Sequence, residues 1–102
     1  MYAVVSVWQM EKGKAAEQEQ ILRQRIVSST SRAAGFVAGY WTIDEATSTA
    51  HGMIVLETEE AARRFKESVE SNRPNQEKVG VRQQKLVITR VLAHASAGAT
   101  GS

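Results

Sequence analysis

The 102-residue chain contains no cysteine and one proline, and it has only two residues each of Trp, Tyr and Phe. The missing cysteines exclude a disulfide framework, a thiolate metal site and a cysteine nucleophile. Their absence fits a reducing compartment, so we expect a cytoplasmic protein.

Long hydrophobic runs are also missing. The apolar stretches have the length of β-strands, whereas roughly 20 apolar residues are needed to cross a bilayer. Residues 1–10 lack the basic region, apolar run and small-residue cleavage site of a secretory signal. We therefore expect a soluble protein with no membrane partner.

No charge of one sign dominates the chain, because 13 basic and 11 acidic residues leave a net charge of +2. The basic residues are spread along the chain, mostly near acidic ones. Nucleic-acid binding usually needs a concentrated basic patch with aromatic platforms. We expect no nucleic-acid partner.

What the chain does contain is one domain's worth of alternating strand and helix patterns, predicted over residues 1–94 and followed by a flexible tail, 95–102. The expected strands, rich in β-branched and aromatic residues, span 2–10, 36–43, 49–56 and 85–93. Helix formers predict helices over 14–31 and 58–71, the second capped by Thr58, with Ala62, Phe65 and Val69 on its apolar face. Pro74 follows this helix and is expected to open an irregular stretch. The order β-α-β-β-α-β predicts a ferredoxin-like α+β fold, a four-stranded antiparallel sheet with two helices on one face.

Both faces of this predicted sheet are mainly apolar. In the second strand, for example, simple alternation gives one set of Phe36, Ala38 and Tyr40 and another of Val37, Gly39, Trp41 and Ile43. Two helices cover only one face, and soluble monomers rarely expose an apolar surface of several hundred Å². We therefore predict a homodimer in which two sheets pack face to face about a two-fold axis.

Three segments resemble a known family. Gly13-Lys14, the stretch Gly35 to Tyr40, and Leu56 to Ala61 leading to Phe65 are similar to the dimeric α+β barrel superfamily, and most similar to its antibiotic-biosynthesis-monooxygenase-like branch. The resemblance covers about residues 2–93. It implies the same fold and a dimer through the sheet face. It does not imply one activity, because the superfamily includes oxygenases, haem-degrading enzymes, isomerases and ligand-binding regulators.

The resemblance also implies a pocket between helices and sheet, in which some members oxidise phenols or quinols without metal or flavin. The candidate catalytic residues are Tyr40, His51 and Ser6, and the candidate substrate-binding residues are Trp8, Phe36 and Leu56. Haem-degrading members have a polar residue where Ser6 stands and a tryptophan where Leu56 stands. Residues 58–71 offer no histidine as an axial ligand, so we expect no haem and no other cofactor.

Each candidate also has a structural interpretation. The Ser6 hydroxyl is expected to bond nearby backbone, Trp8 and Tyr40 to pack in the core, and His51 to lie at the dimer contact. His51 and His94 are far apart in sequence and neither is near a carboxylate cluster, so no metal site is expected.

Three functions follow as hypotheses. The first is cofactor-independent oxygenation of a small aromatic compound of the quinol or anthrone type. The second is a non-enzymatic small-ligand-binding or regulatory homodimer that uses the same pocket. The third is a dimer without a deep pocket.

Overall fold

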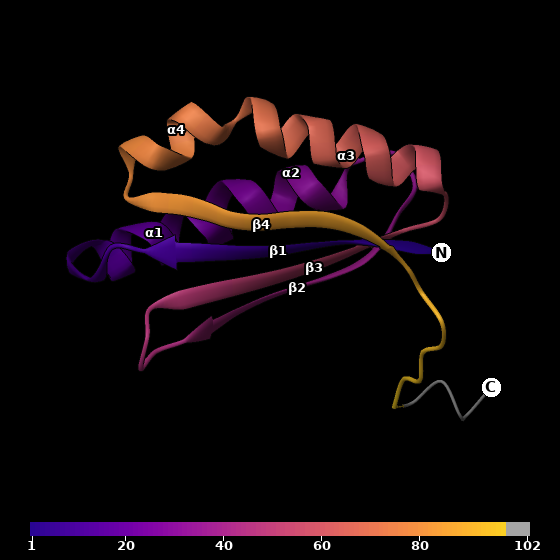
Figure 1. Ribbon diagram of the computed structural model, residues 1–102, viewed down its shortest axis with the longest axis horizontal. Coiled ribbons are helices and arrows are strands. Elements are labelled where there is room, and N and C mark those ends of the chain that lie inside the picture. Colours follow the sequence, from indigo (N-terminus) through magenta and orange to yellow (C-terminus); the bar gives the residue numbers. More distant parts are fainter. Residues whose placement is uncertain (98–102) are drawn as a thin grey trace.

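The computed structural model describes residues 1–97, so residues 98–102 of the expected tail lie outside the described part. The strands are β1 (Tyr2–Met10), β2 (Phe36–Asp44), β3 (Thr49–Leu56) and β4 (Val81–Arg90). They form one antiparallel sheet in the order β2-β3-β1-β4. Figure 1 shows the helices on one side of this sheet. The predicted β-α-β-β-α-β order and fold class are confirmed.

The first helical segment follows a short 3₁₀ turn, η1 (Lys12–Lys14), and runs through α1 (Ala15–Ile21), the π-helical turn η2 (Leu22–Ile26) and α2 (Val27–Ser31). The fully buried residues of this segment, Gln18 and Thr30, are polar, whereas Ala15 is exposed. Gln18 donates from Nε2 to the carbonyl oxygens of Val79 at 2.9 Å and Gly80 at 3.2 Å. This long-range bond fixes the helix against the turn that precedes β4.

The second helical segment is α3 (Glu59–Ser71), followed directly by the short helix α4 (Arg73–Lys78). The predicted cap is confirmed, since the Thr58 hydroxyl accepts a hydrogen bond from the backbone N–H of Ala61 at 3.1 Å. The expected irregular stretch after Asn72 is wrong. Pro74 lies in the first turn of α4, where its missing N–H would have had no helical partner.

The fourth strand also differs from its expected bounds. It begins at Val81, four residues earlier than expected, and ends at Arg90 instead of Ala93. Pairing with β1 extends to Met10–Val81 across a bulge next to Val7 and Trp8. The polar residues Arg82, Gln83 and Gln84 therefore belong to a strand, although Val81 is the only strand-forming residue directly beside them.

We call the face of the sheet toward the helices the inner face and the opposite one the outer face. A register shift between Phe36 and Ala38 interrupts the alternation of β2. The bulge places Phe36 on the inner face with Trp41, and Tyr40 on the outer face with Met53. The expectation that Phe36 and Tyr40 share a face is therefore wrong.

The pairing arranges the inner face in four rows across the sheet, written from β4 to β2. These are Arg90-Tyr2-Leu56-Phe36, Ile88-Val4-Ile54-Gly39, Leu86-Ser6-Gly52-Trp41 and Gln83-Trp8-Ala50-Ile43. The hydrophobic core lies over the first three rows, where Leu56 and Val4 are fully buried. The predicted apolar face of α3 is confirmed, because Ala62, Phe65 and Val69 pack there.

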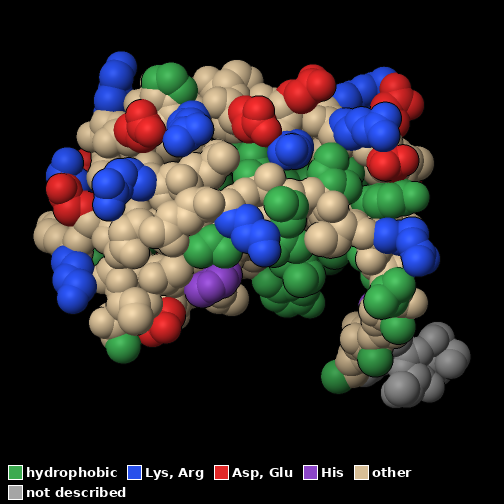
Figure 2. All heavy atoms as spheres, viewed as in Figure 1, with side chains coloured by type: hydrophobic (Ala, Val, Ile, Leu, Met, Phe, Trp, Pro, Cys, Tyr) green, Lys and Arg blue, Asp and Glu red, His purple; other side chains and the backbone are tan. Residues whose placement is uncertain are grey.

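The outer face has no covering layer within the described chain. Tyr40 is 66% exposed and Met53 is 46% exposed. Figure 2 shows charged side chains over the helical side and hydrophobic side chains with a histidine on the opposite side. No helix within residues 1–97 has the length and apolar character needed to span a membrane.

Candidate functional site

The inner face changes character from one end to the other. The rows of Leu56 and Val4 are apolar and tightly packed, whereas the rows of Ser6 and Trp8 combine a hydroxyl, two indoles and an amide. We call these two rows, with Ser6, Trp8, Trp41 and Gln83 as their functional side chains, the tryptophan end. It is the candidate binding site.

Ser6 is buried at the tryptophan end, with 8% of its surface exposed. Its cross-strand partner is Gly52, and a Cβ atom at position 52 would lie only 2.6 Å from the Ser6 Oγ. The glycine therefore leaves room for the serine hydroxyl on the inner face. A hydroxyl in such a position can donate to or accept from a bound molecule.

Each tryptophan has a small residue as a neighbour on the inner face. Trp41 lies across Gly39, where a Cβ would come within 2.9 Å of the indole Cη2 atom. Trp8 is half-buried in the next row, opposite Ala50 on β3 and Gln83 on β4. Indole rings beside small residues can offer a flat apolar surface, which suits a planar ring.

The structure divides the predicted catalytic residues between the two faces. Ser6 lies on the inner face, whereas Tyr40 and His51 lie exposed on the outer face, on neighbouring strands. Within residues 1–97 of one protomer, Ser6 and Trp8 therefore face the helices while Tyr40 faces away from them. The bulge in β2 is the physical reason, because it turns Tyr40 away from the helices.

The predicted substrate-binding residues are divided as well. Trp8 belongs to the tryptophan end, while Phe36 and Leu56 share the row at the far end of the inner face. Leu56 is fully buried in the core and Phe36 packs against that core. Their contact with a substrate stays a prediction. Within residues 1–97, no cluster of His, Cys, Asp and Glu could hold a metal ion.

Sequence reasoning missed a group of glutamines near the tryptophan end. Gln18 is satisfied by backbone carbonyls, but the Oε1 atoms of Gln76 on α4 and Gln83 on β4 are buried without a hydrogen-bond partner. An unsatisfied buried acceptor costs about 1–3 kcal/mol. The only sequence signal for Gln83 was the β-branched Val81, two residues before it.

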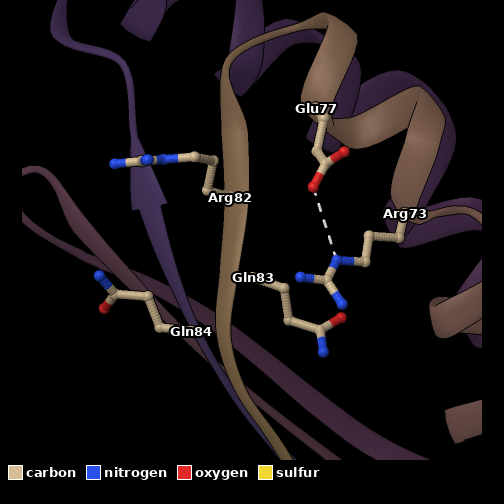
Figure 3. A pocket seen from close by; sticks show the side chains of 5 residues that line it. All are labelled: Arg73, Glu77, Arg82, Gln83 and Gln84. Atoms are coloured by element: carbon tan, nitrogen blue, oxygen red, sulfur yellow. Dashed lines mark ion pairs between the residues drawn. The ribbon is translucent and has the colours of Figure 1, made fainter.

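A hollow of about 320 Å³ lies between α4 and the edge of β4. Its lining residues are Arg73, Glu77, Arg82, Gln83 and Gln84. Figure 3 shows Gln83 on the same side of β4 as Arg73 and Glu77, with Arg82 and Gln84 on the opposite side. The Nε atom of Arg73 lies 3.5 Å from the Glu77 Oε2. On the side of β4 that faces α4, the charged groups of this lining are one cation and one anion, Arg73 and Glu77, beside the Gln83 amide.

Comparison with known proteins identifies the fold. No family model matches the chain, and no curated protein matches its sequence. A solved structure from Deinococcus radiodurans, described as a "putative antibiotic biosynthesis monooxygenase", matches with a TM-score of 0.69 and 16% identity, over 96% of this chain and 97% of that one. The heme-degrader MhuD from Mycobacterium tuberculosis, solved with two hemes bound in its active site, matches with a TM-score of 0.72 and 11% identity, over 94% and 100% of the two chains.

These identities are low, so the matches show the fold alone. The chain has the same fold as these two proteins, which is the fold that the resemblance implied. The predicted fold relationship is confirmed.

Proposed function

We propose that the protein binds a small planar aromatic molecule at the tryptophan end and oxygenates it without a cofactor, as for a quinol or an anthrone. The observation that supports this most is the inner-face row in which Gly52 makes room for the Ser6 hydroxyl beside Trp41. Ser6 would orient the ring through one oxygen, while the indoles of Trp8 and Trp41 hold its faces. The structural likeness to a protein described as a putative antibiotic biosynthesis monooxygenase is in keeping with this proposal.

Non-enzymatic ligand binding or regulation is the second candidate, and one observation favours it. Tyr40 and His51, two of the three predicted catalytic residues, lie on the face opposite Ser6. The tryptophan end then has a binding surface, but of the predicted catalytic residues it holds Ser6 alone. A general acid or base must be within hydrogen-bond reach of the proton that it transfers.

Oxygen consumption with a panel of hydroquinones and anthrones separates the two candidates. We expect uptake with the native protein and a loss of about tenfold or more in Ser6→Ala, where the orienting hydroxyl is removed. Ser68→Ala, which makes the same change at an exposed serine of α3 outside both proposed surfaces, is the matched control and should leave the rate unchanged. Binding of the same compounds without oxygen uptake would overturn the oxygenase and favour the ligand-binding protein.

The proposal includes a homodimer formed through the outer face. Tyr40 and Met53 are exposed there, next to the half-buried Val5 and Val87 of the same row. A second sheet packed on this surface would remove it from water and would surround His51 with protein. A cytoplasmic location is part of the same proposal and is supported by the absence of cysteine.

Sedimentation at micromolar concentration tests the dimer. We expect two protomers for the native protein and one for Met53→Glu, because burying an unpaired carboxylate between the sheets is costly. Gln20→Glu places the same charge on the exposed surface of α1 and should remain dimeric. A native protein that sediments as a monomer would contradict this part of the proposal.

A further inference from the structure

Two glutamines at the α4 and β4 end have buried acceptor oxygens without a donor in the protein. Three glutamine side chains from three elements are buried or half-buried there: Gln18, Gln76 and Gln83. Gln18 uses its amide N–H groups fully on two backbone carbonyls, while Gln76 and Gln83 each hold a buried acceptor oxygen with no donor. Buried polar atoms in native proteins normally have partners, so these oxygens call for a donor.

Gln83 is the glutamine best placed to meet a ligand. It is the cross-strand neighbour of Trp8 on the inner face, and it also lines the hollow between α4 and β4. Side chains directly opposite each other on neighbouring strands have Cβ atoms about 5 Å apart, so a ring on Trp8 brings its edge within reach of the Gln83 amide. The residue therefore joins the tryptophan end to the hollow.

Arg73 adds the complementary group. It lies on the same side of β4 as Gln83 (Figure 3), and its ion pair with Glu77 runs through Nε. The two terminal nitrogens of the guanidinium are left to donate in one plane, an arrangement that matches a carboxylate. An acceptor on Gln83 and donors on Arg73 thus line one hollow.

We infer that Gln83 and Arg73 select the ligand, accepting from a hydroxyl and donating to a carboxylate or carbonyl oxygen on the same edge of a planar aromatic ring. This inference rests on the proposed binding of an aromatic molecule at the tryptophan end. It assigns specificity to two residues outside the predicted catalytic set. It also narrows the ligand class from any flat aromatic to hydroxylated aromatic acids or carbonyl compounds.

Calorimetric titration with three matched compounds tests the inference. The probes are 4-hydroxy-2-naphthoate, 4-methoxy-2-naphthoate, which lacks the donor, and 1-naphthol, which lacks the carboxylate. The hydroxyl and carboxylate of the first compound are too far apart to bond each other, so both are free for the protein. We expect the native protein to bind 4-hydroxy-2-naphthoate at least about tenfold more tightly than either of the other two compounds. A site built to hydrogen-bond a substrate group disfavours an analogue that lacks it, which here is the hydroxyl donor in one compound and the carboxylate in the other.

Three variants assign the contacts. Gln83→Leu should bring the hydroxy-to-methoxy ratio close to one, and Arg73→Gln should remove the preference for the carboxylate over 1-naphthol. Gln20→Leu, a control on the exposed surface of α1, should change neither ratio. Should Gln83→Leu fail to fold, Gln83→Glu keeps an acceptor oxygen and should retain the preference for the hydroxyl while weakening binding of the acid by charge repulsion.

The possible results separate the two claims. If the native protein binds none of the three compounds, the proposed function itself fails. If it binds all three equally, or if the ratio survives in Gln83→Leu, ligand binding stands and the roles of Gln83 and Arg73 are overturned.

Discussion

Leu56 and Met53 stand three residues apart on β3, yet Leu56 is fully buried while Met53 is 46% exposed. The same contrast separates Val4, 1% exposed on the inner face, from Tyr40, 66% exposed on the outer face. All four side chains are mainly hydrocarbon. The difference arises because both helical connections lie on the same side of the sheet (Figure 1). The chain connectivity therefore decides which face of the sheet is buried within one protomer. The hydrophobicity of the strands predicts only that both faces are unfavourable to expose to water.

The largest expected effect tests this contrast directly. Leu56→Ala removes a fully buried side chain from the core and should lower the free energy of unfolding by about 3 kcal/mol. Met53→Ala on the outer face should cost less than about 1 kcal/mol in dilute protein, where assembly contributes little. Urea unfolding of both variants gives the comparison. Equal losses would mean that the outer face is as well packed as the inner one.

Gly35 controls the spacing between the sheet and α3. It has a φ of +80°, and a Cβ there would lie 2.9 Å from the Cβ of Ala61. Gly35→Ala should therefore destabilise the protein by about 2 kcal/mol through backbone strain and crowding. Gly13→Ala is the control, because no atom lies within 4 Å of its added Cβ. Similar unfolding midpoints for the two variants would contradict this role.

The N-cap of α3 stabilises one of the helices that cover the inner face of the sheet. Thr58→Ala removes the hydroxyl that accepts from Ala61 N–H and should cost about 1 kcal/mol. Thr58→Ser retains the hydroxyl and should stay close to the native stability. Thermal unfolding followed by circular dichroism measures both. A loss in Thr58→Ser as large as that in Thr58→Ala would place the effect in the methyl group instead of the cap.

The smallest effect is expected on the solvent side of the same helix. Arg64 pairs with Glu60 at 2.6 Å, but about two-thirds or more of each side chain is exposed. Exposed pairs of this kind contribute about 0.5 kcal/mol or less. Arg64→Ala should barely change the midpoint of urea unfolding, and added salt should not enlarge this change. A larger loss would show that the helices are held by surface charge as well as by the core.

Much of this architecture is readable in the sequence, and the exceptions have physical causes. The strands β1 and β3 match their predicted bounds because dense β-branched runs end at clear turn residues. The start of β4 was missed because pairing with β1, and not local propensity, makes Arg82 and Gln83 extended.

The candidate site was harder to predict than the fold. Ser6 and Trp8 share the inner face as alternation predicts, but the bulge near Val37 carries Tyr40 to the outer face and no sequence feature announces it. The burial of Gln18 depends on carbonyls 61 and 62 residues away. Such polar contacts depend on the assembled tertiary structure, so neither periodicity nor composition reveals them.

The position of β4 in the strand order has a consequence for solubility. Within the described chain it pairs with β1 alone, so one side of a ten-residue strand keeps unpaired N–H and C=O groups. Three cations, Arg82, Lys85 and Arg90, are spaced along it. A second copy adding its own β4 would bring like charges together, and such charges discourage edge-to-edge growth into fibres. The charged edge therefore opposes edge-to-edge pairing through β4.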